Sequence, residues 1–262
     1  MATFEVGGRT IGYQSHGSGM PLLAIHGTTQ SASAWDQVRS ASDFGATWVC
    51  AELPGSGESS LPGGPIDLDT VVEDLVLLMS SLGHDRFDVA GYSLGAVVAL
   101  RLAALHPSRV RSVTSVCGWA TTDARMRLTF DLWSRLIETD VALFMRYALV
   151  DGYTARALSA LEPMAEAAVS MAASLVQPGS LAHLELDRRI DVAACLGDIS
   201  SPCLVVGGIQ DRWVDISHSR HVASLVPGSR SVDIDAGHLV LGENPGEVAS
   251  ALAAHLLAAS KD

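Results

Sequence analysis

The sequence predicts an α/β protein in which helices cover both faces of a mostly parallel sheet. Two observations predict this fold class. Short apolar segments typical of buried strands alternate with segments of helical periodicity, and the alternation stops once, between Trp119 and about Asp191, before it resumes. In addition, a chain of 262 residues with 48% hydrophobic residues is long enough and apolar enough for one large domain with a sizeable core.

The predicted hairpin at the amino terminus rests on two segments, 3–6 and 9–15, that flank Gly7-Gly8. Two glycines between strand-like segments are a signal for a tight turn. The next two predicted strands, 21–25 and 47–52, are apolar runs bounded by turn residues. Such runs are typical of strands that are buried on both faces of a parallel sheet.

Two strands and two helices then follow in alternation. Residues 68–82 carry apolar side chains at helical spacing, which predicts a helix with one buried face. Residues 96–106 are apolar nearly all round, which predicts a helix buried on more than one side, and Pro107 ends it. The apolar runs 87–90 and 110–116 are predicted as strands.

The stretch from Trp119 to about Asp191 is rich in Ala, Met and Leu and contains no convincing strand, so we expect several helices there. After it come a predicted strand over 203–207, a helix around 216–226, a strand over 231–234 and a helix over 247–259. A helical insertion in an α/β chain is typical of a cap over the sheet. We therefore expect residues 1–118 and 192–262 to form the core and residues 119–191 to form a helical cap inserted in it.

Composition excludes several classes of function. The net charge is −12, whereas a nucleic-acid-binding face needs clustered Lys and Arg. Lys261 is the only lysine, so the chain has no polybasic patch for an anionic membrane. We find no apolar run of signal-peptide or membrane-span length, and we expect a soluble, cytoplasmic protein. Four cysteines show no metal-ligand spacing and are predicted to be reduced and mostly buried: Cys50, Cys117, Cys195 and Cys203.

The segment Gly91-Tyr92-Ser93-Leu94-Gly95 fits the pattern Gly-x-Ser-x-Gly. The pattern gains weight from its context, because a predicted strand ends just before it and a helix begins just after Ser93. Such a sharp strand-to-helix turn exposes the serine hydroxyl and needs glycines where a side chain would collide with backbone. The helix amino terminus also favours developing negative charge. Ser93 is therefore the predicted nucleophile.

A serine hydroxyl needs a general base, and His238 is the candidate among nine histidines. It follows the last predicted strand and precedes the last helix, which places it at the same edge of the sheet as Ser93. Asp211 directly follows the strand over 203–207 and is the predicted acid. Asp215 is a competing candidate, disfavoured by its greater distance from that strand. The chain order Ser, Asp, His is the order of one known triad fold.

With these motifs in place, the chain resembles the α/β-hydrolase fold from one end to the other. Within that superfamily it is most similar to small capped serine esterases and lactonases such as the 3-oxoadipate enol-lactonases. The matching segments, in chain order, are His26-Gly27, Pro54 to Ser59, Gly91 to Gly95, Gly207 to Asp211, and Gly237-His238 with Glu243-Asn244-Pro245.

The resemblance implies an oxyanion hole made by the backbone N–H groups of Thr28 and Leu94, with Thr29 as an alternative donor. It assigns His26 a structural role under that loop. Relatives commonly have proline where this chain has Asp215, which keeps Asp215 open as the triad acid. The residues that we expect to line the substrate pocket are Thr29, Cys117, Trp119, Met145 and Leu239.

The predicted function is hydrolysis of a carboxylic ester or lactone of a small to medium apolar substrate through an acyl-enzyme. No cofactor and no metal are expected, and the expected partner is a small-molecule ester or lactone substrate. Serine at position 93 argues against the dehalogenases and epoxide hydrolases of this fold, whose nucleophile is a carboxylate. Two alternatives stay open: a non-hydrolytic member of the fold (a cyclase or a ligand-binding protein), and a C–C bond hydrolase.

Overall fold

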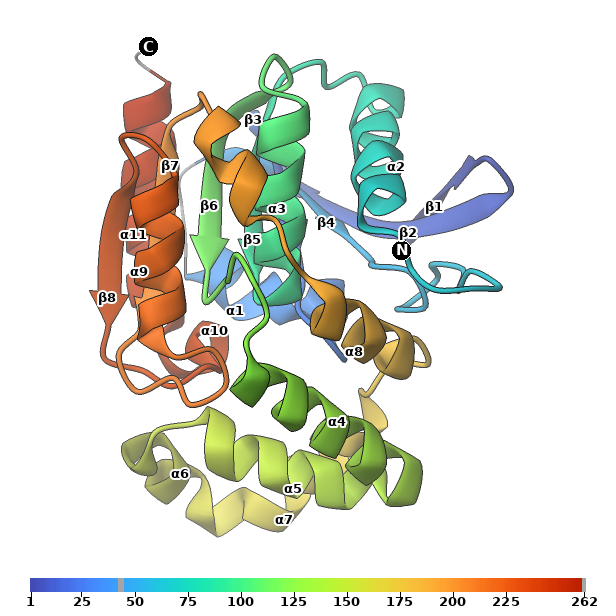
Figure 1. Cartoon of the computed structure of the whole chain (residues 1–262), viewed down its shortest axis with the longest axis vertical. Helices are drawn as coiled ribbons and strands as arrows, with labels where there is room; N and C mark the ends of the chain where they lie inside the picture. Colours follow the sequence, from blue (N-terminus) through green and yellow to red (C-terminus); the bar gives the residue numbers. More distant parts are fainter. Residues whose placement is uncertain (42–44, 261–262) are drawn as a thin grey trace.

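One mixed sheet runs through the computed structural model, which describes residues 1–41 and 45–260 (Figure 1). Within these residues the sheet has eight strands in the order β1-β2-β4-β3-β5-β6-β7-β8. β2 is antiparallel to both of its neighbours, and β3 to β8 are parallel, which confirms the predicted fold class. The strands are β1 (Ala2–Val6), β2 (Arg9–Gly17), β3 (Met20–Ile25), β4 (Ala46–Ala51), β5 (Phe87–Tyr92), β6 (Val110–Val116), β7 (Cys203–Gly208) and β8 (Arg230–Ile234).

Helices cover both faces of the sheet and bury a core on each. One face is covered by α2 (Leu68–Ser81), α3 (Leu94–Leu105) and α9 (Ile216–Leu225), and the other by α1 (Asp36–Ser40), α10 (Val240–Glu243) and α11 (Pro245–Ala259). Successive side chains of β3 enter the two cores in turn: Leu23 belongs to the first and Leu22 to the second. This alternation is why the inner strands are apolar throughout.

The predicted strands and long helices are all present, with small shifts at their ends. β5 runs two residues beyond the predicted end, and α3 begins at Leu94, two residues before the predicted start. The short helices η1 (Ala32–Trp35), α1 and α10 were not predicted. Each is about one turn long, too short to show helical periodicity in the sequence.

Between β6 and β7 the chain forms a bundle of helices, here called the helical insertion, which lies beyond the carboxyl ends of the parallel strands (Figure 1). Its aromatic centre is continuous with the core on the α3 face of the sheet and includes Phe130, Trp133 and Phe144. The insertion comprises α4 (Ala124–Thr139), α5 (Val141–Gly152), α6 (Ala155–Leu161), η2 (Glu162–Met164), α7 (Ala165–Ser174) and α8 (Ser180–Arg189); η3 (Ala193–Asp198) then leads back to β7.

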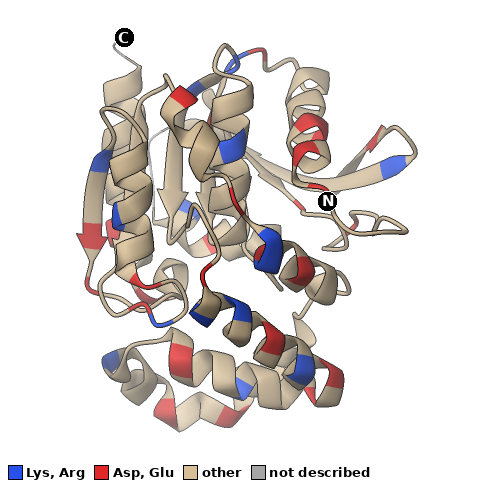
Figure 2. Cartoon of the chain, in the orientation of Figure 1, with Lys and Arg blue, Asp and Glu red and all other residues tan. Residues whose placement is uncertain are grey.

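Charged residues are scattered over the sheet-covering helices and the helical insertion alike, with no concentration of Lys and Arg in the view of Figure 2. Lys261, the single lysine of the sequence, lies outside the described residues. None of the helices in the described ranges combines the length and the apolar character that crossing a membrane requires.

Candidate active site

Ser93 sits at the turn between β5 and α3 in a backbone conformation that few residues adopt. Its φ is 54° and its ψ is −120°. The turn is so tight that a Cβ on Gly91 would come within 2.0 Å of the Gly95 carbonyl oxygen. A Cβ on Gly95 would come within 2.3 Å of the Ile25 carbonyl oxygen. Both glycines are thus required by close approach of backbone, and the strained serine is the kind of feature that gathers at functional sites.

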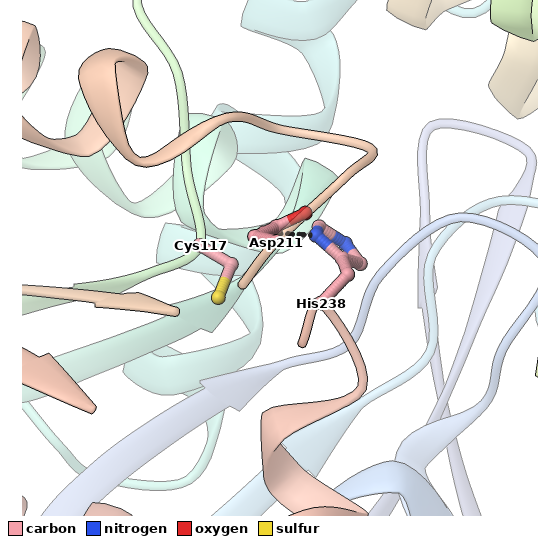
Figure 3. Close-up of side chains that lie close together, drawn as sticks. All are labelled: Cys117, Asp211 and His238. Carbon is pink, nitrogen blue, oxygen red and sulfur yellow. Dashed lines mark hydrogen bonds and ion pairs between the residues drawn. The ribbon is translucent and has the colours of Figure 1, made fainter. Parts of the chain in front are cut away.

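His238 lies between Ser93 and Asp211 and is hydrogen-bonded to both. Its Nδ1 lies 2.6 Å from Oδ2 of Asp211, and its Nε2 lies 3.0 Å from Oγ of Ser93. Because a carboxylate only accepts, Nδ1 carries the proton and Nε2 accepts the serine hydroxyl. Figure 3 shows Asp211 turned toward the imidazole. All three residues follow parallel strands, whose carboxyl ends meet at one edge of the sheet.

Further contacts hold the imidazole and the carboxylate in place. Oδ1 of Asp211 accepts hydrogen bonds from the backbone N–H groups of Trp213 and Val214, each at 2.9 Å. The Tyr92 hydroxyl donates to the His238 carbonyl oxygen at 2.9 Å, and the Trp213 ring lies 4.7 Å from the imidazole between centroids. Sequence reasoning missed both aromatic residues. Tyr92 occupies the variable position inside the Gly-x-Ser motif, and nothing in the sequence marks Trp213.

Asp215 has a different local role. It is the residue before α9, and its Oδ1 accepts a hydrogen bond from the Ser217 backbone N–H at 2.9 Å. The hydrogen bond to Ser217 is the main reason why the pKa of the Asp215 carboxyl lies below its ordinary value. This is the geometry of a helix amino-terminal cap.

The loop after β3 passes beside Ser93. A Cβ on Gly27 would approach the Ser93 Cβ to 3.0 Å. His26 supports the loop from below, since its Nδ1 donates to the Gly27 carbonyl at 2.8 Å and its Nε2 accepts from the Leu53 N–H at 3.0 Å. Leu94 is the first residue of α3, where backbone N–H groups have no helical acceptor. The structure therefore brings the loop that contains Thr28 and the start of α3 to the same serine.

A cavity of about 300 Å³ opens in front of Ser93 and His238, between the sheet edge and the helical insertion. One part of its lining is apolar and includes Trp133, Phe144, Met145, Ala148, Leu175, Val176, Trp213 and Leu239. Another part is polar but uncharged and consists of Thr29, Gln30, Ser31, Ser33 and Gln37. None of the described residues that line it is Asp, Glu, Lys or Arg.

Three of the residues expected around the substrate, Thr29, Met145 and Leu239, do line this cavity, but Cys117 and Trp119 do not. Trp119 is buried, with its indole N–H donating to the Thr122 hydroxyl at 2.8 Å and its ring packed near Phe130. The prediction that Cys117 and Trp119 line the substrate pocket was therefore wrong. The side chains that follow a strand end can turn into the core as readily as into a cavity.

Cys117 lies beside Asp211 instead, as Figure 3 shows. Its backbone has a φ of 49°, and burial raises the pKa of its thiol well above the ordinary value, with the Asp211 charge adding to the effect. The ligand-type atoms of Cys117, Asp211 and His238 lie within 4.8 Å of one another. However, the 2.6 Å between His238 and Asp211 is a hydrogen-bond distance, whereas two such ligands of one tetrahedral zinc ion would lie about 3.3 Å apart.

A second buried carboxyl group lies behind the loop after β3. Asp187 of α8 is fully buried, and its Oδ2 accepts a hydrogen bond from the Thr28 hydroxyl at 2.7 Å. Its Oδ1 has no hydrogen-bond partner among the described residues. Burial raises the pKa of the Asp187 carboxyl to about 8, although the Thr28 hydrogen bond and the Arg188 charge act in the opposite direction.

This burial predicts a pH-dependent stability that Asp187→Asn removes. Between about pH 4 and pH 8 the unfolded chain releases the Asp187 proton and the folded chain keeps it, so rising pH costs folded-state stability. The loss is at most about 1.4 kcal/mol per pH unit inside this window. Asparagine has no such proton. The melting temperature of Asp187→Asn minus that of the wild type should therefore be larger at pH 8 than at pH 5.

The control for that measurement is Asp191→Asn, because Asp191 is exposed and its variant should show no such trend. Equal differences in melting temperature at the two pH values for Asp187→Asn would contradict the buried, protonated carboxyl.

Comparison with known proteins agrees with this architecture. A family model described as the α/β-hydrolase fold matches residues 20–245. The chain is 29% identical to a pyrrolizixenacetamide deacetylase of Xenorhabdus hominickii over 98% of both chains. Among solved structures it resembles an enol-lactonase from Burkholderia xenovorans, with a TM-score of 0.88, 20% identity and coverage of 98% and 100%. A hydrolase from Pseudomonas aeruginosa matches with a TM-score of 0.85, 25% identity and 97% coverage of both chains.

Proposed function

The chain belongs to the α/β-hydrolase fold family, and we propose that it is a serine hydrolase that cleaves a carboxylic ester or lactone of a small to medium apolar substrate. The observation that carries this proposal is the position of His238, 3.0 Å from the Ser93 hydroxyl and 2.6 Å from the Asp211 carboxylate, at the wall of the cavity. This is the arrangement that turns a weak nucleophile into a strong one.

In the proposed mechanism, His238 takes the proton of Ser93 as the hydroxyl oxygen attacks the substrate carbonyl. The backbone N–H groups of Thr28 and Leu94 stabilise the resulting oxyanion, and each such donor contributes about 3 to 4 kcal/mol of transition-state stabilisation. Asp211 fixes the imidazole tautomer and stabilises the imidazolium. The imidazolium then gives its proton to the leaving alcohol, and water releases the acyl group from Ser93 by the same steps.

We also propose that residues 119–191 act as the cap of this site. Side chains of α4, α5 and α7 supply much of the apolar wall of the cavity, including Trp133, Met145 and Ala172. The end of α5 also contacts the loop that carries His238, since the Leu239 N–H donates to the Gly152 carbonyl at 3.0 Å. Closing the site in this way excludes water and strengthens each electrostatic interaction inside it.

The uncharged lining indicates an uncharged acyl group. A carboxylate on the acyl chain would lose its hydration with no cation to pair with it, which costs several kcal/mol. The net charge of −12 also disfavours an anionic substrate. The site therefore differs from what 3-oxoadipate enol-lactone needs, because that lactone carries a free carboxylate.

A pair of adipate esters tests this selectivity. One has a p-nitrophenyl ester at one end and a free carboxylate at the other, and the second has that carboxylate methylated. We expect kcat/KM for the methylated compound to be at least about 100-fold higher, the factor that corresponds to roughly 3 kcal/mol of desolvation. Equal values for the two esters would contradict an uncharged acyl site while leaving Ser93 as the nucleophile.

Amide hydrolysis is a second candidate, favoured by the relative that is named a deacetylase and that aligns over 98% of both chains. Its mechanism would use the same residues, with His238 protonating a leaving amine. Matched p-nitrophenyl acetate and p-nitroacetanilide separate the two, because they carry the same acyl group on oxygen and on nitrogen. Ester preference supports the first proposal, and comparable rates support the second.

Labelling with a fluorophosphonate tests the serine chemistry without knowledge of the substrate. We expect stoichiometric labelling of Ser93 that is abolished in Ser93→Ala. A wild-type protein that stays unlabelled would favour a non-hydrolytic member of the fold, since a ligand-binding protein needs no activated serine.

A further inference from the structure

The hydroxyl of Thr28 is bound by a residue that comes from the helical insertion and not from the sheet. Asp187 lies in the last two turns of α8 and accepts the Thr28 hydroxyl at 2.7 Å. Both side chains are buried. Resting on the proposed function, in which the Thr28 N–H is an oxyanion donor, this contact links the insertion to the catalytic site across 159 residues of sequence.

We propose that Asp187 is a positioning residue that aims the Thr28 N–H at the oxyanion by holding the Thr28 hydroxyl. The helical insertion would thereby complete the oxyanion hole in addition to covering the cavity.

The loop needs such a hold because its own backbone is strained. Thr29 has a φ of 66°, in the left-handed region that a β-branched residue rarely adopts. Hydrogen bonds hold the neighbouring peptide groups: the Gly27 carbonyl accepts from His26 Nδ1 at 2.8 Å and from the Gln30 N–H at 3.2 Å, and the Thr29 carbonyl accepts from the Gln177 N–H at 3.4 Å. None of these contacts involves the Thr28 N–H, so they leave its direction to be fixed by the Thr28 side chain. A strained peptide persists only where its surroundings fix it.

Asp187 is itself fixed, so it can act as an anchor. Its backbone carbonyl accepts the Thr122 hydroxyl at 2.5 Å, which ties α8 to the chain that leaves β6. One turn earlier, Nε2 of His183 donates to the Pro54 carbonyl at 2.8 Å, and the Gly179 N–H donates to the Gly55 carbonyl at 2.8 Å. These contacts fasten α8 to the core independently of Thr28.

The cost of placing Asp187 there supports a role beyond packing. A fully buried carboxyl group with one oxygen unpartnered within the described residues destabilises the fold relative to an apolar side chain. An exposed Thr–Asp hydrogen bond could link two segments without this cost. The insertion has such a pair at its base, where the Thr121 hydroxyl donates to Oδ1 of Asp191 at 3.0 Å. That pair is a matched control of the same chemistry.

The test compares variants that keep or remove this hydrogen bond. Thr28→Val and Asp187→Ala remove it, whereas Thr28→Ser keeps the hydroxyl and Asp187→Asn keeps an acceptor oxygen. kcat and KM are measured on a neutral p-nitrophenyl ester, with the active fraction of each preparation counted by fluorophosphonate labelling. Melting temperatures are recorded alongside. Thr121→Val and Asp191→Ala serve as controls.

We expect Thr28→Val and Asp187→Ala each to lower kcat per active site by about 10- to 100-fold with little change in KM, because a misaimed donor acts on the transition state. Thr28→Ser and Asp187→Asn should recover most of that loss. The double variant Thr28→Val/Asp187→Ala should be no worse than the poorer single variant, since both remove the same hydrogen bond. The control variants should keep wild-type kcat.

Three results would overturn the proposal: wild-type kcat in Asp187→Ala, multiplicative losses in the double variant, or equal losses in the control pair. Each is distinct from failure of the proposed function, which would appear as turnover that persists without Ser93. A variant that fails to fold is not labelled by the fluorophosphonate and so is not counted as active protein. In that case the kcat values of Thr28→Ser and Asp187→Asn test the proposal.

Discussion

Ser93→Ala is expected to lower kcat by about 10⁶-fold while the protein stays folded, because removing a triad serine leaves only binding and the oxyanion donors to act on the substrate. The substitution deletes a single oxygen at the turn between β5 and α3. The backbone at this position is strained, with a φ of 54°, and alanine tolerates the conformation about as poorly as serine, so stability should change little. Hydrolysis of a p-nitrophenyl ester and the melting temperature are the two measurements.

The matched control is Ser250→Ala, which removes an exposed serine hydroxyl from α11 that donates to the Gly246 carbonyl at 2.8 Å. It should keep wild-type activity. A Ser93→Ala protein that retains a tenth of the wild-type kcat would remove Ser93 from the mechanism, whatever the fluorophosphonate result.

Asp211→Asn is expected to lower kcat by about 10⁴-fold with little loss of stability. In the wild type, Oδ2 of Asp211 accepts the Nδ1 proton of His238, and this fixes Nε2 as the acceptor of the Ser93 hydroxyl. An asparagine amide in that place favours the other tautomer. Its oxygen can still accept from the backbone N–H groups of Trp213 and Val214, which keeps the loop intact.

Asp215→Ala is the comparison that makes this prediction decisive. Asp215 caps α9, so its loss should reduce the free energy of unfolding by about 1 kcal/mol and spare most of kcat. Thermal unfolding and steady-state kinetics are measured on both variants. A low kcat in Asp215→Ala together with a wild-type kcat in Asp211→Asn would assign the acid role to Asp215 instead.

Much of this site is readable from the sequence because its signals are local. Each candidate triad residue is marked by a signal within a few residues of it. Glycines flank Ser93, a strand ends just before Asp211, and His238 lies between the last strand and the last helix. Parallel strands place their carboxyl ends at one edge, so strand order alone brings these three segments together. The choice between Asp211 and Asp215 as the candidate acid also rests on local sequence. Asp211 comes soon after the end of a strand, whereas Asp215 directly precedes a helix, where an Asp commonly serves as the cap.

The helices α1 and α10 could not be predicted in the same way. Each spans about one turn, and no periodic pattern can appear in so few residues. They form because the loops that contain them pack against α11 and the sheet, where Val38, Val240 and Leu241 join the second core.

The sequence by itself determined the order of the elements, the sharp turn at Ser93 and the edge of the sheet at which the candidate triad residues gather. Only the tertiary structure decided which side chains face the cavity in front of Ser93. Cys117, whose backbone lies in the left-handed region, is buried beside Asp211, and Trp119 turns into the core. The contact of Asp187 with Thr28 joins residues 159 positions apart, and that of Tyr92 with His238 joins residues 146 apart. Side-chain direction and long-range pairing depend on how the whole core packs, and no local pattern encodes them.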